Sequence, residues 1–595
     1  MYTILYKYSM SGSYFGVGDK VNINQTDIEI KCEGNDQFEE NQVVGIYIPP
    51  SIKFFSGKDC TLNFDIDITS DTTGNAVPHK WLLDSVTGAN GLFSKCVVYA
   101  GNRQTVLETL DNYSSWCSVK YDYDKNDSIQ SRRAMTEGSG EWMATSRGEC
   151  GTSKSIQNNV LFNPYNEQSN KGLAPTDTIT ATTDFTRASV SIPIHMGLFA
   201  NNPKAVPNIA INGCYIELTC ESYAKVFRLL DSTARFRRTA LNPMFHSLDG
   251  AGTQWASGSG QQDFYISKLN MNKDPQHLPF NVGEEISMTN LNDGLDVVFS
   301  TPLLIDSIQT GTADAPVKIR LVNPSSPGVT LNFNTGGGSP NYAIHSVVHA
   351  DTNPKYKLSN MRMIVRQLDI QDYESGMMAK MKNGGVVQFD IPSVACSLAS
   401  TTKNELQATI ACPIEYSKCR SIVAMPSDNE KIYTISENTS STDTYLIDAL
   451  EFNPKSTAHG ILNYSDRSHV TGIGDNLTSY NWLISNKITP SRKINTDKSS
   501  STTLGANADH LIELEKALNQ SHGVPCRSLA SFRSNFLVGR ALTLDPNTVF
   551  NGIGQDVRLL ARYEGTPPTH NKLWKFFISH VKTVSVKGDS INVQQ

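Results

Sequence analysis

The feature that most constrains the fold of this chain is a regular alternation of apolar and polar residues, repeated in many short runs. In the run Cys60–Thr69, every second residue is apolar and the residues between them are threonine, asparagine or aspartate. Such alternation buries one face of a β-strand and leaves the other face in water. Similar runs are Val190–Met196, Cys214–Cys220, Met361–Val365, Val557–Tyr563 and Val584–Val586. The sequence therefore predicts an all-β protein built from stacked antiparallel sheets.

The chain is too long for one core of this type. It has 595 residues, whereas large β-domains run to about 200–250 residues. Hydrophobic residues make up 39% and charged residues 18% of the chain, which is typical of a folded protein and not of a disordered one. We place a domain boundary at Gly384-Gly385. The predicted divisions are a first domain at 1–383, with insertions near 121–185 and 230–350, and a second domain at 384–595.

Helical periodicity is confined to three short segments. The clearest covers about Asp509–Gln520, where leucines recur on one stripe and Asn507 or Asp509 could cap the first turn. A second covers about Asp372–Lys382 and ends at Asn383-Gly384-Gly385, a sequence suited to a helix C-terminus. A third is expected near Val106–Tyr113. Few helices and many strands favour β-sandwiches or barrels.

Charge and hydropathy argue against two classes of partner. The net charge is −6, and the basic residues form no run longer than fragments such as Arg235, Arg237 and Arg238. A dedicated nucleic-acid binder usually carries a basic excess or stripe, so we expect no sequence-specific nucleic-acid binding. We also expect no transmembrane segment and no signal peptide. The 11 scattered cysteines are expected to be reduced, buried thiols of a protein made in the cytosol.

Two segments resemble ligand-binding loops but lack an essential residue. The run Gly148–Ser155 approaches the phosphate-binding pattern GxxxxGK[ST], yet Ser153 stands where the second glycine belongs. Asp122, Asp124 and Asn126 begin like a calcium-binding EF-hand loop, yet the glycine of the sixth position and the glutamate of the twelfth are both absent. We therefore expect no nucleotide site and no EF-hand; a weak cation site in the loop stays possible.

Pairs of potential metal ligands have the wrong spacing. On an extended strand, cysteines six or seven residues apart are separated by about 20 Å or more, too far to share a zinc ion or to form a disulfide with each other. The cysteine pairs concerned are Cys214 with Cys220, and Cys412 with Cys419. His345 and His349 have helical spacing, but the valines between them favour a strand or a loop. We therefore expect no metal site and no cofactor.

Catalytic patterns are missing as well. Asp65 and Asp67 lie on the polar face of a predicted strand, where solvated carboxylates are a simpler explanation than a glycosidase pair. The sequence contains no GxSxG motif, and it offers no cysteine–histidine pairing that would activate a nucleophile. We therefore predict no catalytic residues and no enzymatic activity.

Five blocks of sequence, in matching order, resemble the double jelly-roll major capsid proteins of small double-stranded DNA viruses, most of all those of virophages. The first resembles a strand pair followed by a short helix, and the third a last strand followed by a helix that leads into the second jelly roll. The regions 121–185 and 230–350 match nothing in the family and are expected to be surface insertions. The blocks are Gly91–Trp116, Val190–Cys220, Tyr356–Met381, Asn481–Ile494 with the helix around His510–Leu518, and Phe536–Gly565.

The resemblance implies two eight-stranded jelly-roll β-sandwiches in each chain, with long loop insertions and a few short helices. It implies a homotrimer with a pseudo-hexameric outline that tiles an icosahedral capsid enclosing double-stranded DNA. Expected partners are neighbouring trimers, a separate single jelly-roll penton protein and minor capsid proteins. The expected location is the virion, after synthesis and assembly in the host cytoplasm. The alternatives are a β-rich glycan-binding or fibre protein and, less favoured, a β-sandwich hydrolase.

Overall fold

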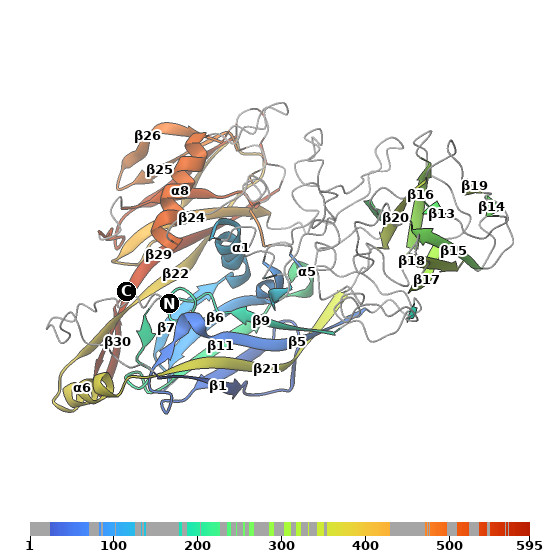
Figure 1. The fold of residues 1–595 in the computed structure, drawn as a ribbon. Coiled ribbons are helices and arrows are strands. Elements are labelled where there is room, and N and C mark those ends of the chain that lie inside the picture. Colours follow the sequence, from blue (N-terminus) through green and yellow to red (C-terminus); the bar gives the residue numbers. More distant parts are fainter. Residues whose placement is uncertain are drawn as a thin grey trace.

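The structure is a computed structural model, and it describes most of the chain (Figure 1). Apart from a few positions within them, the described ranges are 24–70, 83–124, 133–138, 178–180, 187–226, 354–428, 470–496, 508–522, 535–543 and 548–594, together with short strands between 235 and 349. The phosphate-loop-like run at 148–155, Asn126 and the cap candidate Asn507 lie outside the described residues.

Eight strands from the first part of the chain form a sandwich of two antiparallel sheets. One sheet has the order β1-β21-β5-β9 and the other has the order β3-β11-β6-β7. Two short strands, β2 (Gln37–Phe38) and β4 (Phe55–Ser56), pair with β21, and β10 (Ala205–Val206) pairs with β4. The eight main strands are β1 (Asn24–Lys31), β3 (Val43–Ile48), β5 (Thr61–Ser70), β6 (Phe93–Ala100), β7 (Val106–Asp111), β9 (Arg187–Pro193), β11 (Cys214–Cys220) and β21 (Pro354–Asp369).

Eight later strands form a second sandwich. Its sheets have the orders β22-β29-β24-β27 and β23-β28-β25-β26, and β30 (Ser590–Gln594) folds back as a hairpin on the end of β29. The eight strands are β22 (Val387–Thr401), β23 (Gln407–Ala411), β24 (Cys419–Asp428), β25 (Ser479–Ile484), β26 (Lys487–Asn495), β27 (Val538–Ala541), β28 (Val557–Arg562) and β29 (Lys572–Lys587).

The two sandwiches have the same strand order. If the eight strands of each are counted along the chain, one sheet reads 1-8-3-6 and the other reads 2-7-4-5 in both cases. Two interlocked four-stranded sheets in which the last strand returns beside the first are the topology of a jelly roll. The chain therefore contains two jelly rolls, and the all-β, double jelly-roll fold expected from the sequence is confirmed.

The predicted alternation of buried and exposed residues is present in the strands. In β5, the side chains of Leu62, Phe64 and Ile66 are buried, and Phe64 packs edge-on against Phe93 with ring centroids 5.9 Å apart. In β28 the same pattern buries every second residue. The strand predicted to run to Met196 ends at Pro193, and β9 lies at the edge of its sheet. Proline lacks the N–H that an inner strand would donate, so this edge position suits it.

Three helices of eleven residues or more are described. They are α1 (Tyr113–Asp124), α6 (Gln371–Lys382) and α8 (Ala508–His522), and shorter turns are η1 (Gly57–Asp59), η2 (Gly88–Leu92) and α5 (Tyr223–Val226). The helices predicted at 372–382 and 509–520 are confirmed by α6 and α8. Among the described residues, none of the helices has the length and apolar character needed to cross a membrane.

The helix predicted near Val106–Tyr113 is wrong. Val106–Asp111 is strand β7, paired with β6, and the helix begins only at Tyr113. The spacing of Leu107 and Leu110 imitates one turn of a helix. A register shift in the pairing with β6 lets both leucines, and Glu108 as well, point to buried positions of a strand.

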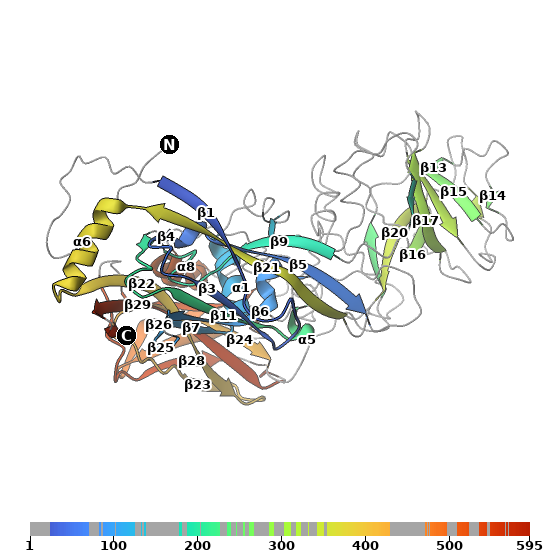
Figure 2. The same ribbon diagram turned by 90° about the horizontal axis from the view of Figure 1, so that it is seen from below.

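A third sheet lies apart from both sandwiches in Figures 1 and 2, and all its strands except the short β8 come from the chain between strands seven and eight of the first jelly roll. Its order is β12-β20-β16-β17-β18-β15-β13, with β8 added beside β17, and β14 pairs separately with β19. The stretch 230–350 was expected to consist of loop insertions, but strands within it form a sheet of their own. Its strands are β8 (Thr178–Thr180), β12 (Arg235–Thr239), β13 (Phe245–His246), β14 (Gln254–Trp255), β15 (Gln261–Ile266), β16 (Glu285–Asn290), β17 (Leu303–Thr310), β18 (Val317–Val322), β19 (Leu331–Asn332) and β20 (Tyr342–His349).

Candidate functional site

The residues nominated from the sequence do not converge on one site. Asp65 faces outward from β5 and accepts hydrogen bonds from Ser189 and, at 3.3 Å, from the Asn360 amide. Cys214 and Cys220 occupy opposite ends of β11. His345 and His349 belong to strand β20, as the valines between them indicated. Within the described part of the chain, no group of three histidine, cysteine or acidic side chains could hold a metal ion.

The cysteines behave as buried thiols. The nine that the structure describes are all free, and seven of them are buried. Burial raises the pKa of Cys220 and of Cys419 to about 12, so both thiols stay protonated at neutral pH. Burial raises the pKa of Cys214 and Cys412 as well. A protonated thiol is a poor nucleophile and a poor metal ligand, which agrees with a packing role for these residues.

The most developed constellation of polar and apolar groups is the seam where the two jelly rolls meet, side by side in Figures 1 and 2. One continuous apolar cluster includes residues of both rolls, so the seam is part of the core. Phe577 of β29 packs against Trp116 of α1 with ring centroids 5.4 Å apart. Val423 and Met425 of β24 belong to the same cluster. The outer face of sheet β22-β29-β24-β27 is therefore apolar where the first roll covers it.

Helix α1 presents a line of polar side chains to the second roll. The Ser115 hydroxyl accepts a hydrogen bond of 2.8 Å from the Lys575 ammonium, and the Ser118 hydroxyl donates one of 2.8 Å to the Val470 carbonyl. Asp122 accepts a bond of 2.7 Å from the buried Asn535 amide. These three helix residues are spaced i, i+3 and i+7, which places them on one face.

The strand side of the seam is formed by β7 and β22, the fifth strand of one roll and the first strand of the other. Glu108 of β7 is fully buried and accepts hydrogen bonds from the backbone N–H groups of Gly197, at 3.0 Å, and Leu198, at 2.8 Å. A Cβ placed on Gly197 would lie 2.4 Å from the Pro392 carbonyl oxygen and 2.7 Å from Ile391 Cγ2. Only glycine fits this point of contact between the rolls.

Buried charges at the seam have shifted pKa values. Burial, with a smaller effect of the nearby Lys225 charge, lowers the pKa of Lys575 to about 8. Burial also lowers the pKa of Lys582, which the negative charge of Glu108 partly opposes. Burial raises the pKa of Glu108, against the hydrogen bonds that its carboxylate accepts. These pKa shifts reflect the free-energy cost of burying charged groups in an interface. All three groups are buried, so none of them is a reactive group at the surface.

A second buried network anchors α1 within the first roll. Tyr121 donates a hydrogen bond of 2.7 Å to Glu137 and lies 2.6 Å from His195 Nε2. Arg133 donates to the same carboxylate at 3.1 Å and stacks over the Tyr121 ring, 3.2 Å from its centroid. Asn90 donates to Glu137 at 2.9 Å. Glu137, Arg133 and Tyr121 thus hold one another in place. Such a buried hydrogen-bond network fixes one arrangement of a core.

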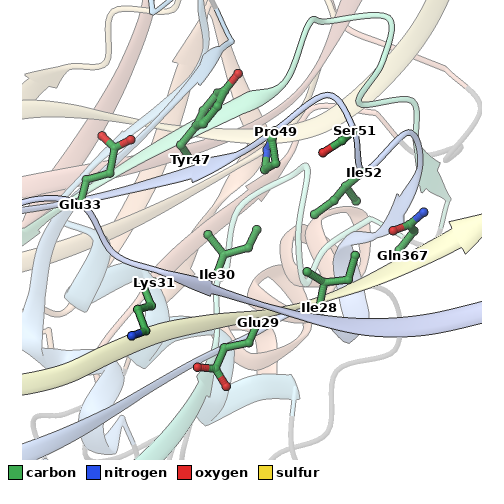
Figure 3. A pocket seen from close by; sticks show the side chains of 10 residues that line it. All are labelled: Ile28, Glu29, Ile30, Lys31, Glu33, Tyr47, Pro49, Ser51, Ile52 and Gln367. Carbon is green, nitrogen blue, oxygen red and sulfur yellow. The ribbon is translucent and has the colours of Figure 1, made fainter.

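An open groove of about 520 Å³ runs along the free side of β1 (Figure 3). Figure 3 shows Ile28 and Ile30 turned toward Pro49 and Ile52, while Glu29 lies on the other side of the strand. The groove is lined by both apolar and charged side chains and contains no cluster of catalytic type.

The sequence did not reveal the seam. The polar residues of α1 follow a helical period, and that signal was available in Ser115, Ser118 and Asp122. The helix was instead placed several residues too early, so the period could not be recognised. The partners of these residues lie more than 350 positions away in the chain, and contacts of that range leave no local pattern.

Comparison with known proteins gives matches only among solved structures. No family model matches the chain, and no curated protein matches it. The crystal structure of PBCV-1 VP54 fitted into a reconstruction of the virophage Sputnik is 9% identical, with a TM-score of 0.46, and the match covers 98% of this chain and 99% of that one. The Faustovirus major capsid protein is 8% identical, with a TM-score of 0.45 and coverage of 96% and 92%.

The mavirus major capsid protein is 8% identical, with a TM-score of 0.34 and coverage of 100% of this chain and 95% of that one. At these identities a shared function does not follow, and the assignment of the fold rests on the strand order of the two sandwiches. The solved structures similar to this chain are viral major capsid proteins, the same class that its sequence blocks resemble.

Proposed function

We propose that this chain is the major capsid protein of an icosahedral double-stranded DNA virus of the virophage type, and that three copies form one pseudo-hexameric capsomer. The observation that carries the proposal is the repetition of one strand order, 1-8-3-6 over 2-7-4-5, in two consecutive sandwiches. Three copies then supply six sandwiches of the same topology. A ring of six such units has the outline of a hexagon, which tiles a closed shell.

The seam inside the chain supports this role. Its apolar cluster and its hydrogen bonds hold the two sandwiches in a fixed relation. A building block of a shell needs such a relation, because the curvature of the lattice depends on the angle between neighbouring units. Cyclic closure is also the common outcome when identical chains associate head to tail.

The remaining features of the proposed role follow from the capsid assignment. The chain would be a component of the virion shell, without enzymatic activity, and assembled in the host cytoplasm. Its partners would be neighbouring capsomers, a single jelly-roll protein at the fivefold vertices and minor capsid proteins. The division into a first domain at 1–383 and a second at 384–595 remains our proposal for the limits of the two jelly rolls.

Negative-stain imaging of the purified full-length chain tests the proposal. We expect class averages with a hexagonal outline and threefold symmetry, the threefold arising because the two rolls of each chain differ in sequence. Particles the size of one chain, without such an outline at any protein concentration, would contradict the capsid role. Screening of those particles against glycans would then test a binding role instead.

A further inference from the structure

The groove along β1 lies at a side of the first jelly roll that its two sheets leave open. β1 and β3 are edge strands of different sheets. Just after β1, Glu33 forms a bridge with Gly45 of β3. From this bridge the groove of about 520 Å³ extends between residues 28–31 of β1 and residues 47–52, at and after the end of β3 (Figure 3). The groove therefore borders the core between the two sheets.

The wall of the groove is apolar on its core side. Ile28 and Ile30 of β1 are half-buried and pack against the core of the first roll. Pro49 and Ile52 lie opposite them across the groove (Figure 3). Half-buried isoleucines at the border of a groove lose further contact with water when a chain segment fills it, which favours such a segment.

The outer side of β1 also offers backbone groups. Just after β1, the Cys32 N–H donates to a carbonyl of β21, and the following N–H, of Glu33, donates in the opposite direction to Gly45. Successive N–H groups of a strand point to opposite sides, so those of Glu29 and Lys31 point away from β21. Among the described strands, only β21 pairs with β1. The outer side of β1 can therefore accept a further strand.

The sequence before β1 contains a run with the pattern of such a strand. In Tyr2–Met10 every second residue is apolar or aromatic, and three of the four residues between them are polar. This is the alternation that is typical of strands with one buried face. The run belongs to residues 1–23, which lie outside the described part of the chain.

We propose that Tyr2–Met10 binds as an additional strand to the outer side of β1 in the same chain, with its apolar face in the groove. Alternate side chains of a strand are about 7 Å apart, which is also the spacing of Ile28 and Ile30, so the two rows interdigitate. The inference goes beyond the capsid role and does not depend on it, because it concerns a single chain. The apolar face of the run is formed by Tyr2, Ile4, Tyr6, Tyr8 and Met10.

The attachment of the run to β1 favours this occupant over a separate partner. The 13 residues between Met10 and Asn24 include three glycines, and 13 residues can extend to about 45 Å. The eight residues of β1 span only about 27 Å, so the run can turn back along the whole strand. A tethered segment is present at a high effective concentration, so modest contacts are sufficient to hold it.

Hydrogen exchange of the full-length chain tests the proposal. The amide hydrogens of Glu29 and Lys31 should be protected in the wild type. Tyr6→Ser should speed their exchange about tenfold, because one large apolar side chain is no longer buried. Leu5→Ser, on the other face of the run, is the matched control and should leave the exchange unchanged.

Neither Tyr6 nor Leu5 belongs to the described core, so these variants keep the jelly roll intact. Amides of Glu29 and Lys31 that exchange freely in the wild type, or at the same rate in Tyr6→Ser, would overturn the proposal.

Cross-linking tests the groove side. Lys7 of the run and Lys31 at the border of the groove should be joined by a short amine-reactive cross-linker. Ile30→Asp should reduce this link about tenfold, whereas Val43→Asp, at a position that is 51% exposed and does not line the groove, should keep it. Melting curves establish that both variants are folded.

Chains with two isotope labels, mixed before they assemble, show whether the link forms within one chain. Lys7 and Lys31 should be joined only within chains of the same label. Links between unlike labels would overturn binding within one chain, and a link unaffected by Ile30→Asp would overturn the groove as its site.

Discussion

Lys582, in the last long strand of the second jelly roll, donates a hydrogen bond of 3.3 Å to the backbone carbonyl of Leu107, 475 residues earlier in the fifth strand of the first roll. The bond closes a seam whose apolar part is continuous with the core of the first roll. Two sandwiches that share a core in this way should unfold together and not as independent domains.

Replacement of Gly197 by alanine should destabilise the seam. The added Cβ would lie 2.5 Å from Glu108 Oε1 and 2.4 Å from the Pro392 carbonyl oxygen, so the rolls would have to move apart. We expect a loss of about 1–3 kcal/mol in the free energy of unfolding, measured by chemical denaturation. Gly376→Ala in the exposed middle of α6, where the added atom meets nothing within 4 Å, is the matched control. It should be neutral or stabilising by up to about 1 kcal/mol, and equal losses in both variants would contradict this account of the seam.

Lys575 makes the stability of the protein depend on pH in a specific direction. Its pKa is lowered from 10.5 to about 8 by burial, so between these values the unfolded chain binds more protons than the folded one. The cost of burying the ammonium is therefore complete below pH 8 and is relieved as the pH rises toward 10.5. Lys575→Met should be more stable than the wild type at pH 7, by about 1–3 kcal/mol, and this advantage should shrink at pH 10.

The measurement is denaturant unfolding of both proteins at the two pH values. Lys587→Met, at the exposed end of the same strand, controls for the general loss of a lysine and should show no such dependence on pH. A stability difference between wild type and Lys575→Met that is the same at pH 7 and pH 10 would mean that the ammonium is not buried at the seam.

Asn535→Ala should weaken the attachment of α1 to the second roll. The Asn535 amide donates to Asp122 at 2.7 Å and to Ser118 at 3.3 Å, and its oxygen accepts from the Gly472 N–H at 2.8 Å. Removal leaves a buried carboxylate without one of its donors, at a cost of about 1–3 kcal/mol. Hydrogen exchange should report faster exchange in α1, whereas the exposed Asn551→Ala variant should leave it unchanged; protection of α1 that does not change would refute the role of Asn535.

Truncation of Phe64 to alanine tests the strand assignment of the first jelly roll. Phe64 is 2% exposed and packs on Phe93, so its removal should cost about 3–5 kcal/mol and lower the yield of soluble protein. Val43→Ala, at a position that is 51% exposed on β3, should leave both nearly unchanged. An unaltered melting temperature for the Phe64 variant would show that this side chain is not in the core.

Period-two alternation predicted several strands of both jelly rolls, because burial on one face of a sheet produces a local pattern in runs such as Cys60–Thr69. The helices at 372–382 and 509–520 could be recognised from the same kind of local signal. At Val106–Asp111 the local signal misled, since the pairing partner β6 and its register shift decide the structure there. In 230–350 the runs Leu303–Thr310 and Val317–Val322 form strands of a separate sheet, and the pairing that joins them could not be foreseen.

The seam was beyond prediction from the sequence for a physical reason. Strand order within a jelly roll joins residues that are distant in the chain, and the contact of β7 with β22 depends on the packing of two completed sandwiches. Glu108 illustrates this, because it lies in a segment that was predicted to be a helix, yet it is fully buried in a strand.

The mass of the purified protein in solution, measured by light scattering, tests the central claim most directly. We predict one species near three times 65.4 kDa that is stable to dilution. A single species of 65.4 kDa at all concentrations would contradict the proposal that three chains, each with two jelly rolls, form the capsomer of a viral shell.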